Sequence, residues 1–180
     1  MANEINSQAM NRRTFFSTTG AAALAIGATA PAKASSSVAS SSFTYEVTRT
    51  EEEWRAMLTE DEYYIMREGG TERKRSSPLW LENTQGSYHC KGCDLKSFDG
   101  RWKIILDKGW VFFFHAEPDA VLMSIDGAVP EYGAMAETEK ALTEIHCRRC
   151  GSHLGHFLKV EGTQTHCMNG ASLTFKPDAA

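Results

Sequence analysis

Residues 147–157 read Cys-Arg-Arg-Cys-Gly-Ser-His-Leu-Gly-His-Phe and place two histidines directly after a Cys-x-x-Cys knuckle. A second knuckle, Cys-Lys-Gly-Cys, occupies residues 90–93. Cys-x-x-Cys spacing lets both sulfurs of a turn point at one ion, so the two knuckles together supply a tetrahedral thiolate set. The predicted zinc ligands are Cys90, Cys93, Cys147 and Cys150. Four sulfurs leave no open coordination position, so the zinc is expected to be structural.

The two knuckles are separated by residues 94–146, which is far more than the roughly 15 to 20 residues of a compact zinc ribbon. One ion would therefore tie together two hairpins that are distant in the sequence. The competing interpretation is two disulfides or thioredoxin-like redox pairs, which an exported protein could form. Against it, neither knuckle opens a helix in a βαβ context.

Short runs rich in β-forming residues, separated by Gly, Asp or Pro, follow residue 85. The predicted strands are residues 87–89, 103–106, 110–115, 121–125, 156–160, 163–168 and 172–175. This pattern is typical of a small antiparallel β domain.

Two short helices are expected before these strands. Thr50 with Glu53, and Thr59 with Glu62, form capping boxes ahead of apolar residues at helical spacing. Gly69-Gly70 should end the second helix. The predicted fold class is therefore mainly β (α+β), with a short N-terminal helical cap.

The N-terminus has the order of a secretory signal peptide over residues 1–34. Arg12-Arg13 precede a weakly apolar stretch, and Ala32-Lys33-Ala34 offers a small-residue cleavage site. The arginine pair resembles a twin-arginine export signal, which predicts a periplasmic or exported protein. The alternative is an amphipathic or disordered N-terminus. The stretch is too short and too weakly apolar for a membrane span, so no stable membrane insertion is expected after cleavage.

Residues 35–42 are mostly serine and are expected to form a linker to a single domain at 43–180. A chain of 180 residues has room for one ordinary domain, and we expect a monomer. Nineteen basic against 23 acidic side chains give a net charge of -4. A nucleic-acid partner is therefore not expected.

Cys167 remains once four of the five cysteines are assigned to the metal. A lone cysteine is more often a buried small apolar residue than a nucleophile. His153 and His156 strengthen the second interpretation, because histidine gives and takes protons near neutral pH. Strand alternation places Cys167 and Asn169 on one face and His166 on the other.

The order and spacing of these residues make the sequence resemble the B-type methionine sulfoxide reductases. The elements that carry the resemblance are Gly70-Thr71-Glu72, Tyr88-His89-Cys90-x-x-Cys93, Gly109-Trp110, Cys147-x-x-Cys150-Gly-Ser-His153-Leu-Gly-His156-Phe and Cys167-Met-Asn169-x-x-Ser172-Leu-x-Phe175. The resemblance spans about residues 51 to 175.

The resemblance implies two antiparallel sheets with a structural zinc and reduction of the R epimer of methionine sulfoxide in proteins. By position, Cys167 corresponds to the nucleophile, and His153 and His156 to the groups that bind and protonate the sulfoxide oxygen. Asn169 corresponds to an orienting amide. Trp110 corresponds to the wall against which the substrate methyl group packs.

Several positions depart from the family pattern. The resolving cysteine that often precedes the Gly-Trp pair is absent from Asp107-Lys108, so an external small thiol or a thioredoxin-like donor is expected to reduce the enzyme. Thr165 stands where the family has an arginine, which removes a positive charge that would favour the thiolate. The Pro-Ser-Phe that follows the tryptophan in the family is Val111-Phe112-Phe113 here.

A noncatalytic, zinc-anchored binding module with an aromatic pocket is the alternative function. The aromatic residues available to form such a pocket are Trp102, Trp110, Phe112, Phe113 and Phe114. A binding module has no need for Cys167 together with both histidines, and that set separates the two hypotheses.

Overall fold

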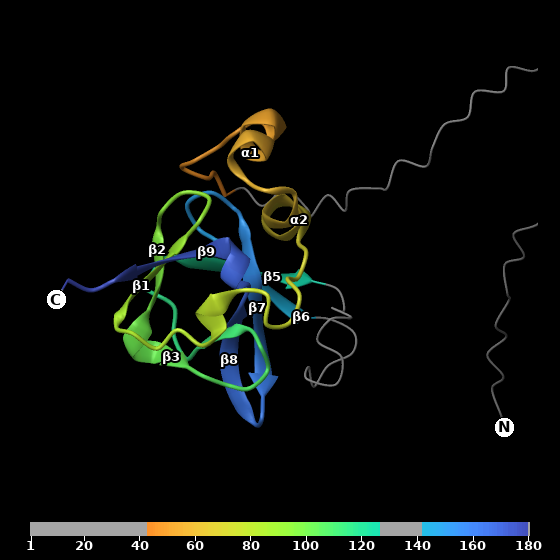
Figure 1. The fold of residues 1–180 in the computed structure, drawn as a ribbon. Coiled ribbons are helices and arrows are strands. Elements are labelled where there is room, and N and C mark those ends of the chain that lie inside the picture. Colours follow the sequence, from red (N-terminus) through yellow and green to blue (C-terminus); the bar gives the residue numbers. More distant parts are fainter. Residues whose placement is uncertain (1–42, 127–141, 180) are drawn as a thin grey trace, which may run out of the picture. The chain divides into compact units, whose positions relative to one another are not determined.

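The structure is a computed structural model that describes residues 43–126 and 142–179 (Figure 1). The predicted signal peptide at 1–34 and linker at 35–42 lie outside the described residues. Within the described ranges, no helix has the length and apolar character needed to cross a membrane.

Two short helices open the domain, as the capping boxes predict. Helix α1 spans Glu51–Met57 and helix α2 spans Glu60–Glu68. In each, the N-cap threonine accepts a hydrogen bond from the backbone of the glutamate three residues later, whose carboxylate accepts one from the threonine N–H. Gly69 ends α2 in the left-handed conformation (φ 72°), where glycine carries no Cβ penalty. Helix α2 packs against strand β7 of the larger sheet.

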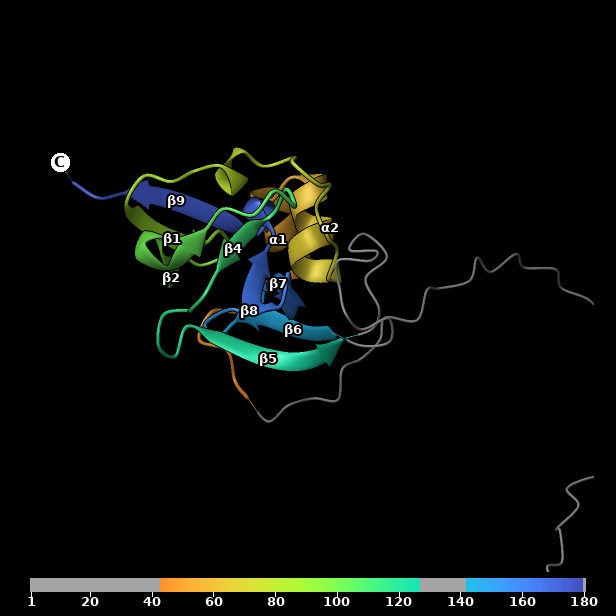
Figure 2. The same cartoon turned by 90° about the horizontal axis from the view of Figure 1, so that it is seen from below.

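The strands form two antiparallel sheets, which confirms the predicted fold class. The smaller sheet has the order β2 (Lys96–Asp99), β1 (Gly86–Cys90), β9 (Leu173–Pro177). The larger has the order β3 (Lys103–Ile104), β4 (Val111–Phe113), β8 (Thr163–Met168), β7 (His153–Val160), β6 (Leu142–Cys147), β5 (Val121–Asp126). In Figure 2, β5 and β6 lie on the side of the domain away from β1, β2 and β9. In the described parts of the chain, the 3₁₀ turns η1 (Pro78–Trp80), η2 (Gly100–Trp102) and η4 (Gly170–Ser172) join these elements.

Within the described residues, two strands were not predicted from the sequence, and β7 begins three residues earlier than predicted. Strands β2 and β6 carry charged residues within short stretches, so they show no clear apolar alternation. They form because partner strands from elsewhere in the chain complete their backbone hydrogen bonds. Strand β7 begins at His153 instead of residue 156, which places both predicted site histidines within the sheet.

The main core lies between the two sheets. Phe98 of the smaller sheet stacks on Phe113 of the larger one with ring centroids 4.5 Å apart, and Tyr88 contacts Phe113 edge-on at 5.0 Å. All three side chains are fully buried. The interlocked aromatic rings fix the two sheets against one another.

Candidate active site and metal site

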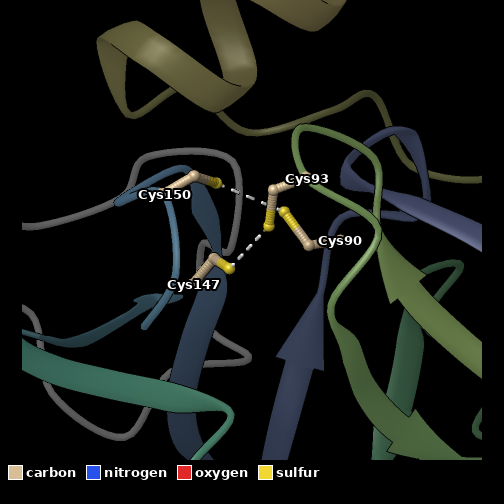
Figure 3. Close-up of side chains that lie close together, drawn as sticks. All are labelled: Cys90, Cys93, Cys147 and Cys150. Carbon is tan, nitrogen blue, oxygen red and sulfur yellow. Dashed lines mark hydrogen bonds between the residues drawn. The ribbon is translucent and has the colours of Figure 1, made fainter. Parts of the chain in front are cut away.

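The four knuckle cysteines meet at one point, as the sequence predicts (Figure 3). Cys90 ends β1 in the smaller sheet and Cys147 ends β6 in the larger sheet. Each strand then turns tightly, with Cys93 N–H donating to Cys90 O and Gly151 N–H donating to Cys147 O. The cluster therefore joins the two sheets.

The sulfur positions fit a single tetrahedral metal ion. The sulfurs lie 3.7 Å apart for Cys90 and Cys150 and 3.5 Å apart for Cys93 and Cys147, and all four are within 4.8 Å of one another. A Zn–S bond of about 2.3 Å in tetrahedral geometry separates sulfurs by about 3.8 Å. All five cysteines belong to the described part of the chain, and none forms a disulfide.

Cys167 lies in the middle of the larger sheet, on β8. Its direct partners are Phe112 on β4 and His156 on β7. Cys167 is fully buried in an apolar cluster that also contains Trp110 and Phe112. The structure thus brings Trp110, which is distant in the sequence, into the cluster around Cys167, while His156 comes from the neighbouring strand of the same hairpin.

A β-bulge brings His153 and His156 to the same face of the sheet. Residues three apart on a regular strand point to opposite faces. Here His153 pairs with His146 and Gly155 pairs with Ile145, so Leu154 is an extra residue on β7. The two histidine rings consequently meet edge to face, with centroids 5.0 Å apart.

Gly155 allows this arrangement. Its φ of 153° is one that residues with side chains rarely adopt. A Cβ at this position would lie 2.2 Å from the backbone oxygen of Cys167. Strands β7 and β8 can therefore approach closely beside Cys167 only with glycine here.

Glu144 is a site residue that the sequence analysis did not identify. Its Oε1 lies 2.8 Å from Nδ1 of the buried His153. Its Oε2 accepts a 2.7 Å hydrogen bond from Ser124 Oγ. The hydrogen bond with His153 lowers the pKa of Glu144 from 4.5 to about 2, against the opposing effect of burial. The carboxylate is therefore ionised at neutral pH.

Asn169 is held by a second acidic residue, Glu72. The Asn169 Oδ1 accepts a 3.0 Å hydrogen bond from Glu72 N–H. In return, the Glu72 carboxylate accepts hydrogen bonds from the N–H groups of Gly170 (2.7 Å) and Ala171 (2.9 Å). Burial raises the pKa of Glu72, although these two hydrogen bonds act in the opposite direction. The Gly-Thr-Glu element of the sequence thus orients the amide of Asn169.

Trp110 lies beside the same loop, nearly buried, and its indole N–H donates to Glu72 O at 3.2 Å. Gly109, just before it, has a φ of 87°, and a Cβ there would lie 2.6 Å from a side-chain carbon of Lys74. The turn that presents Trp110 to the apolar cluster around Cys167 therefore requires glycine.

Two buried polar atoms in this region have no hydrogen-bond partner among the described residues: His153 Nε2 and Asn169 Nδ2. Asn169 N–H donates to Leu154 O, so these two side chains come from adjoining pieces of backbone. Unpartnered buried polar groups are costly and often belong to a binding site. Each could donate a hydrogen bond to an oxygen atom of a bound molecule.

Thr165 is also fully buried on the Cys167 side of β8, where it donates a 3.2 Å hydrogen bond to Leu158 O. Leu158 and Val160 belong to the apolar cluster around Cys167. Thr165 therefore supplies no charge where the similar family has an arginine, and its hydroxyl is hydrogen-bonded to the backbone. His166 points away, as alternation predicts, and packs edge-on against Phe98.

A hollow of about 870 Å³ opens elsewhere on the domain. It is lined by residues of α2, η1, η4 and β9, among them Ile65, Leu79 and Phe175. Glu72 reaches its wall, but Cys167, His153 and His156 do not line it. The candidate active site is thus the buried face around Cys167, and the hollow adjoins the residues that hold Asn169, namely Glu72, Gly170 and Ala171.

Comparison with known proteins identifies a related family. The SelR domain family matches residues 58–177. The "Peptide methionine sulfoxide reductase MsrB" of Agrobacterium fabrum is 35% identical over 136 residues, which cover 73% of this chain and 94% of that protein. The "Peptide methionine sulfoxide reductase B1, chloroplastic" of Oryza sativa is 36% identical over 135 residues. That match covers 73% of this chain and 59% of the rice protein, so the chain spans less than two thirds of the plant relative.

Proposed function

The chain belongs to the SelR domain family of B-type methionine sulfoxide reductases, and on that basis we propose that it reduces methionine sulfoxide in proteins or peptides to methionine. The observation that carries the proposal is the direct pairing of Cys167 with His156, beside the buried His153. A thiol next to two groups that can donate a proton is what the reaction requires.

The reaction is a two-electron transfer of oxygen from one sulfur to another. The thiolate of Cys167 attacks the sulfoxide sulfur, and His153 or His156 protonates the sulfoxide oxygen, so that it need not leave as an oxide. Attack forms a bond between the two sulfurs, and the protonated oxygen then moves as a hydroxyl group to the Cys167 sulfur. The substrate's S–O bond and the new S–S bond both break in this step, so methionine is released and Cys167 becomes a sulfenic acid. The methionine sulfur is reduced and the cysteine sulfur is oxidised.

Substrate binding uses the remaining site residues. The unpartnered Nδ2 of Asn169 and Nε2 of His153 donate hydrogen bonds to the sulfoxide oxygen. Trp110, which shares the apolar cluster with Cys167, packs against the substrate methyl group. A chiral sulfoxide can satisfy the oxygen and the methyl contacts together in only one configuration, and we assign the R epimer.

Regeneration of Cys167 depends on an outside thiol. The sequence has five cysteines, of which four form the metal cluster. Two equivalents of a small thiol, or one dithiol of a thioredoxin-like protein, reduce the sulfenic acid to the thiol with release of water and formation of a disulfide in the donor. Oxidised proteins and this thiol donor are the proposed partners.

The four-cysteine cluster is proposed to hold one zinc ion. Cys90 and Cys93 would bind it from the smaller sheet, and Cys147 and Cys150 from the larger. Bound zinc would supply cross-linking between the sheets and no chemistry at Cys167. Through Cys147 at the end of β6, this cross-link would keep Glu144 in place against the rest of the site.

The alternative of an aromatic binding module is not favoured. Phe112 and Phe113 are fully buried, and Phe113 packs between Phe98 and Tyr88 in the main core. These rings are therefore core residues and do not form an open cage.

We also propose export to the periplasm by the twin-arginine route, on the strength of the signal at residues 1–34. We propose that the protein acts there as a monomer. Replacing Arg12 and Arg13 by lysine should retain the precursor in the cytoplasm. Normal export of the double variant would show that the arginine pair is incidental.

The central experiment incubates the purified protein with peptides that carry the R or the S epimer of methionine sulfoxide, with dithiothreitol as reductant. Consumption of the R epimer alone is expected. Consumption of neither epimer under conditions that keep the protein folded would count against the proposed activity.

A further inference from the structure

We infer that Glu144 is a positioning residue that holds the ring of His153 with its Nε2 directed at the substrate oxygen. The catalytic role of Glu144 rests on the proposed function. Its contact with His153 is seen directly in the structure.

The contact between the two side chains decides where the histidine proton resides. Glu144 Oε1 lies 2.8 Å from His153 Nδ1. An ionised carboxylate only accepts hydrogen bonds, so Nδ1 must carry a proton whether the ring is neutral or charged. The proton that His153 can give or take therefore resides on Nε2.

The other end of the ring is prepared for a ligand. His153 is nearly fully buried, and its Nε2 has no hydrogen-bond partner among the described residues. The His156 ring adjoins it, and His156 pairs directly with Cys167. The protonated Nε2 is thus a buried donor near Cys167, with the His156 ring between the two residues along the sheet.

Glu144 is itself held from two sides. Ser124 Oγ donates to Oε2 at 2.7 Å, and the backbone register places Ser124 and His156 opposite Glu144 on the two neighbouring strands. The charged or titratable groups near this carboxylate are His153, His146 (4.0 Å), His156 and Tyr45, whose pKa is raised by burial and by the charge of Glu144. A carboxylate fixed in this way stabilises the positive charge that His153 must carry when it acts as an acid.

The test compares Glu144→Gln with Glu117→Gln. Glutamine keeps the shape and removes the charge. Glu117 is the matched control, because its side chain is 19% exposed against 21% for Glu144 and it is also ion-paired, with Lys96 at 2.8 Å. We expect kcat for the R sulfoxide to fall about 10- to 100-fold in Glu144→Gln, which is part of the 10²- to 10⁴-fold that a general acid contributes. KM should change little, and Glu117→Gln should match wild type.

A second measurement does not depend on activity. Nitrogen-15 NMR of the His153 ring should show a proton on Nδ1 in wild type and loss of that preference in Glu144→Leu, where the acceptor is gone. An inactive wild type with the expected ring signals would reject the proposed function and leave the positioning intact. Wild-type kcat in Glu144→Leu, an equal loss in Glu117→Gln, or unchanged ring signals in Glu144→Leu would overturn the inference.

Discussion

His156 lies directly opposite Cys167 in the antiparallel pairing of β7 and β8. Side chains opposite one another in such a pair leave the same face of the sheet, with Cβ atoms about 4.5–5.5 Å apart. This single register places a thiol and an imidazole side by side on one face of the sheet. A slip of one residue would send the two side chains to opposite faces and dismantle the site.

Replacing Cys167 by serine should abolish sulfoxide reduction. A serine alkoxide is not available near neutral pH, and a hydroxyl cannot form the sulfenic acid. Because Cys167 is separate from the metal cluster, the variant should fold and retain its metal. Dimedone should label Cys167 in wild type only after exposure to the R sulfoxide without reductant. Labelling of a knuckle cysteine instead would show that the five cysteines have been assigned wrongly.

Replacing His156 by alanine should leave a slow enzyme. A general acid contributes about 10²- to 10⁴-fold, so kcat should fall within that range and remain measurable with R sulfoxide and dithiothreitol. Undiminished kcat in His156→Ala would assign the proton transfer to His153 alone.

Replacing Gly155 by alanine should destabilise the domain and the site together. The φ of 153° costs about 1–3 kcal/mol for a residue with a side chain, and the new Cβ would lie 2.2 Å from Cys167 O. Gly162→Ala is the control, because Gly162 also has a positive φ (82°) but nothing lies within 4 Å of its Cβ position. Gly155→Ala should lower the unfolding temperature more than Gly162→Ala does, and it should also lose activity. Equal losses would mean that the close approach of β7 and β8 has no energetic consequence.

Glu144 should make stability depend on pH in the acid range. Its pKa is about 2 when folded and 4.5 for the free side chain, so its ionised form stabilises the fold above pH 4.5. That stabilisation is lost as pH falls from 4.5 towards 2. The difference in unfolding free energy between wild type and Glu144→Gln should therefore shrink between pH 5 and pH 3. Protonation of the cluster cysteines changes the stability of both proteins alike, so it cancels in this difference. A difference that stays constant with pH would show that Glu144 titrates normally.

Removing the metal should unfold the domain. Structural zinc contributes on the order of 10 kcal/mol, and the unfolded chain has no preformed site. Circular dichroism should report loss of the β signal after chelation, and elemental analysis of the native protein should find one zinc per chain. Active protein without metal, with two disulfides seen by mass spectrometry, would replace the zinc interpretation with a redox one.

The sequence by itself determined the features that depend on short-range spacing. Each Cys-x-x-Cys turn is local, and so are the capping boxes of Thr50 and Thr59, which the structure reproduces bond for bond. Strand alternation in residues 163–168 correctly separated Cys167 from His166. The resemblance to a known family also rests on such local motifs.

Only the tertiary structure decided how distant residues meet. The bulge at Leu154, which turns His153 and His156 to one face, arises from pairing with β6 and leaves no mark in strand alternation. Glu144 meets His153 across the pairing of β6 with β7, and the backbone N–H of Glu72, in the loop after α2, donates to Asn169 Oδ1. Neither contact is visible in a linear pattern. Hydrogen bonding between strands is nonlocal, so the register that builds this site exists only once the sheets have formed.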